Sequence, residues 1–171
     1  MGERVALECH HASTGKETLG VHLAPDGNNK DAFESLMTKA KTWHDNIRVG
    51  HLSPSLLAWQ ATTTSILKSL KYPLPALTLS YDECNKIMAV LKKGLLNSSR
   101  ICTSTPKSIL HGPIEDGGLK LNHLYHTQGI FHIKKFLKFM ASDTMTGRLL
   151  QSSTWHSGSW YWTKHLLPKL Q

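Results

Sequence analysis

The stretch SYDECNKIMAVLKKGLLN, residues 80–97, carries the start, the buried face and the end of an amphipathic helix. Ser80 stands three residues before Glu83, the spacing of a capping box in which each side chain bonds the other residue's backbone N–H. Gly94 and Asn97 mark the end. Apolar residues recur between them at helical spacing: Cys84, Ile87, Met88, Leu91 and Leu95. We therefore predict a helix with one buried face and expect Cys84 in the core.

Helical patterns precede and follow this stretch. NNKDAFESLMTKAKTWHDNIRVG, residues 28–50, has Asn28 or Asn29 as a cap and Gly50 as a stop. SPSLLAWQATTTSILKSLKYP, residues 53–73, opens on Ser-Pro and ends at Pro73, although three consecutive Thr residues weaken the helical pattern. Two further helices are expected over 122–141 and 143–153. The first is capped by Asn122 and carries an apolar side formed by Tyr125, Gly129, Ile133, Phe136 and Met140.

The remaining segments predict little regular structure. Leu19, Val21 and Leu23 alternate as in a strand, and the turn Pro25-Asp26-Gly27 follows. Residues 98–121 are broken by prolines and by Gly117-Gly118, and we expect extended chain or one or two short strands there. The predicted class is mainly α, with one N-terminal strand whose partners would lie in a missing sheet. The expected regions are a frayed lead-in (1–17), the strand and first helices (18–97), a Gly/Pro joint with later helices (98–154) and an aromatic tail (155–171).

Composition narrows the class of protein. Of 171 residues, 40% are hydrophobic and 19% are charged, which argues against intrinsic disorder. No apolar run reaches the roughly 18 residues of a membrane span, and the N-terminus does not resemble a secretory leader. The three cysteines are odd in number and widely spaced, so a disulfide framework is not expected. We expect an intracellular protein, cytoplasmic or nuclear, that is neither secreted nor embedded in a membrane.

The net charge of +8 is distributed unevenly along the chain. Residues 1–85 hold 8 Lys/Arg and 9 Asp/Glu, whereas residues 86–171 hold 12 Lys/Arg and 3 Asp/Glu. A basic half of this kind favours a polyanionic partner, most often nucleic acid. The alternative is a basic surface that serves solubility alone.

Sequence motifs for catalysis are absent, so no catalytic residue is expected. There is no GxSxG motif, no phosphate-binding glycine loop and no Asp-Asp pair, and Tyr81-Asp82-Glu83 stands at a helix cap. Zinc sites commonly use CxxC or HxxxH units, and the chain has no CxxC. No carboxylate or Cys stands within a turn of His123 and His126, so no metal site is expected, and the histidines are interpreted as polar surface residues or phosphate-facing donors.

Basic residues interleaved with aromatic ones are the signal that remains. Such residues neutralise backbone phosphates without reading sequence. A solvated helix face is the alternative for each of them. The predicted phosphate-contacting set is Lys39, Lys41, Lys92, Lys93, Arg100, Lys107, Lys134, Lys135 and Lys138.

The order of these segments resembles the reverse transcriptases of non-LTR (LINE-like) retrotransposons. TLGVHLAPDGNNKDAFESLMTKAKTWHDNI, residues 18–47, resembles the end of the palm and the start of the thumb, and residues 52–79 resemble the second thumb helix. HGPIEDGGLKLNHLYHTQGIFHI, residues 111–133, resembles the GGLG segment that follows the thumb, with Lys120 in place of the last Gly. The likeness covers roughly residues 18–140, and its motif residues are Leu19, Gly20, Val21, Gly117, Gly118 and Leu119.

The resemblance implies part of an RNA-directed DNA polymerase. A thumb grips RNA or an RNA–DNA primer–template duplex through its backbone, next to a palm and fingers that would stand upstream. The catalytic aspartates and their Mg²⁺ would belong to that palm, so the resemblance implies no cofactor here and no polymerisation by this chain alone. Two alternatives stay open: a free-standing basic helical protein that binds nucleic acid, and a helical module that docks on a protein through Trp160, Tyr161 and Trp162.

Overall fold

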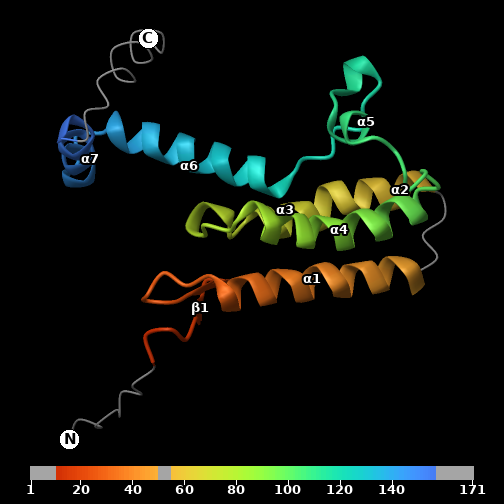
Figure 1. Cartoon of the computed structure of the whole chain (residues 1–171), viewed down its shortest axis with the longest axis horizontal. Helices are drawn as coiled ribbons and strands as arrows, with labels where there is room; N and C mark the ends of the chain where they lie inside the picture. The colour runs from red at the N-terminus through yellow and green to blue at the C-terminus, as the bar shows by residue number, and fades with distance from the viewer. Residues whose placement is uncertain (1–10, 50–54, 157–171) are drawn as a thin grey trace, which may run out of the picture. The chain divides into compact units, whose positions relative to one another are not determined.

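A computed structural model describes residues 11–49 and 55–156 of the chain. It is mainly helical with one small antiparallel sheet before the first helix, which confirms the predicted class (Figure 1). The chain forms two compact units, Met1–Gln128 and Gly129–Gln171, and the boundary falls inside one helix. Gly50, Ser53-Pro54 and the tail residues Trp160, Tyr161 and Trp162 lie outside the described residues.

The first unit starts with a hairpin, where the structure departs from the predicted single strand. Strand β1 (Lys16–Thr18) pairs with β2 (Val21–Leu23), with Thr18 opposite Val21. Leu19 and Gly20 form the two-residue turn with φ of 52° and 78°, the paired positive φ of a type I′ turn. The prediction that Leu19 belongs to the strand, made from the alternation of apolar residues, is therefore wrong. Leu19 is a turn residue and is 85% exposed. Since β2 has a partner within the chain, an unpaired strand no longer argues for a missing sheet.

Helix α1 (Lys30–Val49) packs along α4 (Tyr81–Ser98) to form the core of the first unit (Figure 1). The side chain of Asn28 accepts the Lys30 N–H at 2.9 Å, as expected of the cap. Buried side chains from α1 meet the stripe predicted on α4, all of whose members are buried: Leu36, Ala40 and Ile47 against Cys84, Ile87, Met88, Leu91 and Leu95.

The capping box that begins α4 is confirmed. Ser80 Oγ accepts the Glu83 N–H at 3.3 Å, and Glu83 Oε2 accepts the Ser80 N–H at 2.8 Å. Gly94 was expected to mark the end of this helix but lies inside it. A Cβ at this position would stand 2.7 Å from Nδ1 of His44, so Gly94 permits the close approach of α1 and α4.

The predicted helix over 53–73 contains a wide turn. It runs as α2 (Ser55–Ala61), the π-helical turn η1 (Thr62–Ile66) and α3 (Leu67–Lys71), before the short helix η2 (Leu74–Ala76). Each Thr hydroxyl of the turn donates to the carbonyl four residues before it: Thr62 to Ala58 (2.8 Å), Thr63 to Trp59 (3.0 Å) and Thr64 to Gln60 (2.6 Å). These hydroxyls compete with backbone N–H donors for the same carbonyls, which accounts for the widening.

Residues 98–121 form two short helices, where extended chain or strands were expected. They are α5 (Lys107–His111) and η3 (Ile114–Asp116). Gly117 then turns the chain at φ 76°, as its motif predicts, and the backbone returns alongside α5. Leu119 N–H donates to Ile109 at 2.8 Å, and Leu121 N–H donates to Leu110 at 2.9 Å. The returning chain is thus held by hydrogen bonds to a helical turn.

Helix α6 (Leu124–Met140) follows, and its start belongs to the first unit. Gln128 is buried, and its amide bonds both backbone groups of Leu79. Oε1 accepts the Leu79 N–H and Nε2 donates to the Leu79 carbonyl, each at 3.1 Å. This pair fastens the first turns of α6 to the segment that precedes α4.

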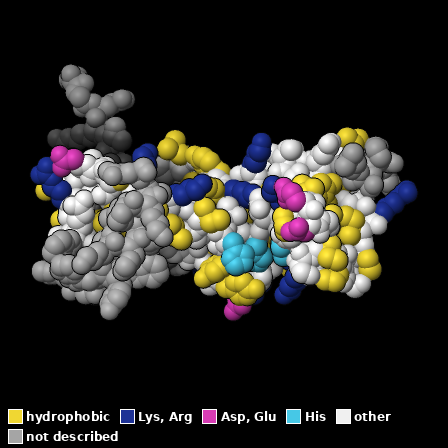
Figure 2. Space-filling model, turned by 90° about the horizontal axis from the view of Figure 1, so that it is seen from above, with side chains coloured by type: hydrophobic (Ala, Val, Ile, Leu, Met, Phe, Trp, Pro, Cys, Tyr) yellow, Lys and Arg dark blue, Asp and Glu magenta, His cyan; other side chains and the backbone are white. Residues whose placement is uncertain are grey.

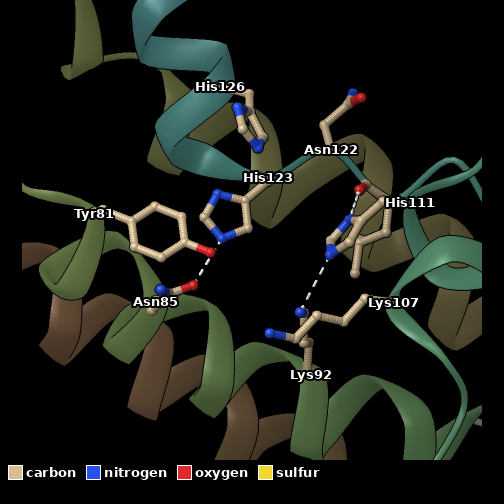
Figure 3. Close-up of a pocket in the computed structure, with 9 residues that line it drawn as sticks. Tyr81, Asn85, Lys92, Lys107, His111, Asn122, His123 and His126 are labelled. Carbon is tan, nitrogen blue, oxygen red and sulfur yellow. Dashed lines mark hydrogen bonds between the residues drawn. The ribbon is translucent and has the colours of Figure 1, made fainter.

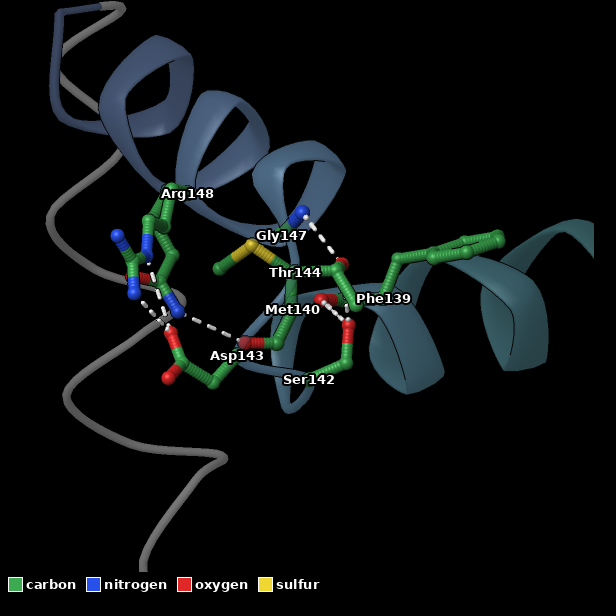
Figure 4. A network of polar contacts seen from close by, with 8 residues as sticks. Phe139, Met140, Ser142, Asp143, Thr144, Gly147 and Arg148 are labelled. Carbon is green, nitrogen blue, oxygen red and sulfur yellow. Dashed lines mark hydrogen bonds and ion pairs between the residues drawn. The ribbon is translucent and has the colours of Figure 1, made fainter.

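The second unit holds the rest of α6 and α7 (Met145–His156), close to the short helix predicted there (Figure 4). Thr144 Oγ1 accepts the Gly147 N–H at 3.2 Å at the start of α7. Ser142 Oγ donates to the Phe139 carbonyl at 2.8 Å, and Gln151 Nε2 donates to the Met140 carbonyl at 2.9 Å. These bonds fix the corner between the two helices. Within the described ranges, no helix has both the length and the apolar composition to cross a membrane.

Candidate anion-binding pocket

The nine predicted phosphate-contacting residues fall in different places. Lys92 (α4) and Lys107 (α5) line one pocket in the first unit. Lys39 and Lys41 are exposed on α1, Lys93 is exposed on α4, and Arg100 follows α4 at φ 55°. Lys134, Lys135 and Lys138 are exposed on the part of α6 that belongs to the second unit.

The pocket has a volume of about 350 Å³ and lies between α4, α5 and the start of α6 (Figure 3). No Asp or Glu lines it. We call it the histidine–lysine pocket, after the side chains that dominate its wall. Its lining residues are Tyr81, Asn85, Lys92, Lys107, His111, Leu121, Asn122, His123 and His126.

The hydrogen bonds of His111 determine which of its nitrogens carries hydrogen. Nδ1 lies 2.5 Å from the Leu121 carbonyl, which can only accept, so Nδ1 is the donor. Nε2 lies 3.2 Å from the ammonium of Lys92, which can only donate, so Nε2 accepts. His111 is therefore neutral in this arrangement. Its position depends on the returning loop, because Leu121 is part of that loop.

The ring of His123 is also neutral, and it caps α6. Nε2 donates to Asn85 Oδ1 at 2.9 Å, and Nδ1 accepts the Tyr125 N–H at 3.2 Å. The expected cap, Asn122, is exposed. The pKa of His123 is lowered to about 4, first by burial, then by the rings of His111 and His126 when these carry a proton, and by the ammonium groups of Lys92 and Lys107. The predicted cap was wrong because α6 begins at Leu124, so His123 rather than Asn122 stands at the capping position.

Aromatic rings extend the wall of the pocket. Tyr81 stacks on His123 with centroids 5.7 Å apart, and Tyr125 meets Tyr81 edge-on at 5.4 Å. The ring of His126 lies 5.3 Å from that of His123. Tyr81 and Tyr125 are 48% and 40% exposed, so a planar ligand would find an open aromatic surface beside the polar groups.

The electrostatics of the pocket are one-sided. Partial burial lowers the pKa of Lys92, and the neighbouring positive charge of Lys107 lowers it further. Figure 3 shows the two lysine side chains running toward each other below His111. Neither forms an ion pair within the described part of the chain. On the space-filled surface, histidine side chains gather in a cluster that has both Lys or Arg and Asp or Glu side chains beside it (Figure 2). An anion inside the pocket would find several donors, and no carboxylate is among the residues that line it.

The same arrangement does not suit a metal ion. Metal coordination needs an imidazole nitrogen with a free lone pair. Nε2 of His111 and Nδ1 of His123 already accept hydrogen bonds. Among residues 11–49 and 55–156, no three His, Cys, Asp or Glu side chains are placed to hold a metal.

The sequence pattern left the histidines as polar surface residues or phosphate-facing donors and did not predict that His111, His123 and His126 line one pocket. A partial signal was present: Tyr81, Asn85 and Lys92 recur on one face of a predicted helix, and His123 and His126 share a face three residues apart. No protein-family model, curated protein or solved structure matches this chain.

Proposed function

We propose that this chain binds RNA or an RNA–DNA duplex through backbone phosphates, as the thumb region of a retroelement reverse transcriptase. The observation that carries the proposal is the histidine–lysine pocket, where two predicted phosphate-contacting lysines meet with no carboxylate among the lining residues. Lysine ammonium groups neutralise phosphates without reading bases. The proposed role is therefore to hold a duplex rather than to select a sequence.

The polymerase part of the proposal rests on the resemblance of residues 18–140 to the end of a palm and a thumb. In this proposal a palm upstream supplies the catalytic aspartates and Mg²⁺, and this chain binds the backbone of the duplex. Two features of the fold are compatible with a thumb: the packed helices α1 and α4, and the exposed lysines that they carry.

Salt dependence measures how many phosphates the chain neutralises. Each phosphate contact contributes a slope of about −0.9 to log K against log salt, and removal of two contacts should reduce the slope by about 2. The double variant Lys92→Gln/Lys107→Gln removes the two pocket charges. The matched control Lys16→Gln/Lys30→Gln removes two exposed charges outside the predicted set.

The experiment is fluorescence anisotropy of a labelled RNA–DNA duplex between about 50 and 200 mM salt. We expect the pocket variant to bind more weakly and with a shallower slope, and the control to stay close to the parent. The triple variant Lys134→Gln/Lys135→Gln/Lys138→Gln measures the contribution of α6 separately. The proposal is contradicted if the parent chain is shown by circular dichroism to be folded and does not bind the duplex at the lowest salt concentration.

An apolar side of α6 favours a second candidate, a helical module for protein docking. Ile130, Ile133 and Phe136 are 52%, 60% and 41% exposed. Exposed apolar side chains at helical spacing are typical of helices that pack on a partner. Sedimentation tests this candidate. It is favoured over the first if the chain does not bind the duplex but self-associates, and if Ile133→Ser abolishes the self-association.

A further inference from the structure

We infer that the histidine–lysine pocket takes the phosphomonoester of a nucleotide, either at the end of a nucleic-acid strand or on a free mononucleotide. The strand-end form of this inference rests on the proposed function. The free-nucleotide form stands without it.

The placement of the donors favours an end group over a continuous backbone. A phosphomonoester presents three terminal oxygens, whereas a diester is joined to the strand on both sides and leaves two. Lys92 comes from α4, Lys107 from α5, and His126 from the first turn of α6. Donors that converge on a cavity from three elements can surround an end group. A backbone that crosses a surface contacts them from one side only.

The charges match a dianion. A phosphomonoester carries a charge near −2 at neutral pH. Lys92 and Lys107 supply two positive charges that repel each other; this repulsion adds to burial, the larger cause, in lowering the pKa of Lys92. An anion bound between the two ammonium groups would offset that repulsion. The N-terminus of the 17-residue helix α6 adds partial positive charge at the same place.

The size of the pocket and its aromatic wall favour a nucleotide over inorganic phosphate. A volume of about 350 Å³ lies at the lower end of the range for small-molecule sites, about 300–1,000 Å³. Tyr81 lines the pocket and is 48% exposed, and Tyr125, which is 40% exposed, meets it edge-on. Stacking on an aromatic ring is sequence-tolerant because every base has a π-face, so this wall suits a terminal base of any identity.

His123 provides a spectroscopic signature of occupancy. Its low pKa has two causes, burial and the positive charges around it. A bound dianion opposes the second cause, so the pKa of His123 should rise on binding. The titratable groups that face it are Tyr81 and Lys92 from α4, Lys107 and His111 from α5, and His126 from α6. None of these groups is a carboxylate that would compete with the ligand.

The test compares one RNA–DNA duplex with a 5′-phosphate and with a 5′-hydroxyl, alongside free adenosine 5′-monophosphate. We expect the phosphate to strengthen duplex binding at least about tenfold, the gain from one charge-assisted hydrogen bond. Lys92→Gln/Lys107→Gln should abolish this preference and Lys16→Gln/Lys30→Gln should keep it. Lys107→Gln alone repeats the test on an exposed residue if the double variant does not fold.

The outcomes separate the inference from the proposed function. Equal binding of the two duplexes, with no binding of the mononucleotide, overturns the inference and leaves the proposed function standing. A mononucleotide that raises the pKa of His123 in a chain that binds neither duplex supports the pocket and overturns the proposed function. The strand-end form is supported if the mononucleotide competes with the phosphorylated duplex and if Lys92→Gln/Lys107→Gln loses the preference for the 5′-phosphate.

Discussion

Replacement of Gln128 by Leu should lower the free energy of unfolding by about 2–4 kcal/mol. Gln128 and Leu79 are 6% and 2% exposed, so both hydrogen bonds between them lie away from water. Leu fills a similar volume but leaves the Leu79 N–H and carbonyl without partners. Each unsatisfied buried group costs about 1–3 kcal/mol, and the added apolar burial of Leu offsets about 1–2 kcal/mol of the total.

Urea denaturation measures the effect, with Gln151→Leu as the matched control. Gln151 makes one amide hydrogen bond to Met140 and is exposed, so we expect its loss to cost less than about 1 kcal/mol. With a slope of about 1–3 kcal/mol per molar urea, a loss of about 2–4 kcal/mol should lower the unfolding midpoint of the Gln128 variant by about 0.7–4 M urea relative to the parent. Midpoints that agree between the two variants would refute the reasoning, since the buried pair would then be worth no more than an exposed bond.

Three further predictions concern the loop and the pocket. Gly118→Ala should lower the free energy of unfolding by about 1–3 kcal/mol, measured by thermal unfolding, because the added Cβ would stand 2.3 Å from the carbonyl carbon of Gly112. An unchanged midpoint would show that the loop accommodates the methyl group without strain. Lys120→Gly should raise the free energy of unfolding by up to about 1 kcal/mol in the same assay. Lys120 has φ 51°, a left-handed conformation that costs a residue with a side chain about 1–2 kcal/mol and costs glycine little. A lower midpoint for the variant would contradict this. The pKa of His123 falls from 6.5 to about 4 on folding, so the unfolded chain binds the extra proton and stability should drop as pH falls from 6.5 toward 4. The full shift corresponds to about 3 kcal/mol, and solvent access reduces our expectation to about 1–2 kcal/mol. Urea midpoints across that window should lose this drop in His123→Asn and keep it in Tyr81→Phe, and a drop retained by His123→Asn would contradict the assignment.

The helices were predictable because their signals are local. The Ser80–Glu83 box lies within one turn, and the stripe from Cys84 to Leu95 belongs to a single helix. Both depend only on residues close in sequence. The hairpin was less predictable, because Leu19 completes an alternating pattern and yet adopts a positive φ that a non-glycine residue seldom takes.

The loop between α4 and α6 was missed because its structure depends on distant contacts. Two short helices form there while Gly112 and Gly118 touch and the returning chain bonds α5. Gly117-Gly118 predicted the turn but not what the turn meets. The helix over residues 55–71 shows an intermediate case, because its run of Thr residues predicted weakness without predicting a π turn.

The pocket was predictable only in part. Lys92 and Lys107 were expected to contact phosphate, each judged by charge and neighbours in sequence. That they meet at one cavity with His111 and His123 follows from how α4, α5 and α6 pack. The protonation of both rings follows from their hydrogen-bond partners, which the sequence does not specify.

The most direct test of the account is residue-resolved NMR of the folded chain during titration with a 5′-phosphorylated RNA–DNA duplex. We predict saturable shifts in the imidazole of His123, the side-chain amide of Asn85 and the backbone amide of Tyr125, because all three belong to one hydrogen-bonded chain at the pocket. The pKa of His123 should rise in the complex. Duplex binding that saturates while these three resonances stay fixed would place the phosphate elsewhere and contradict the account.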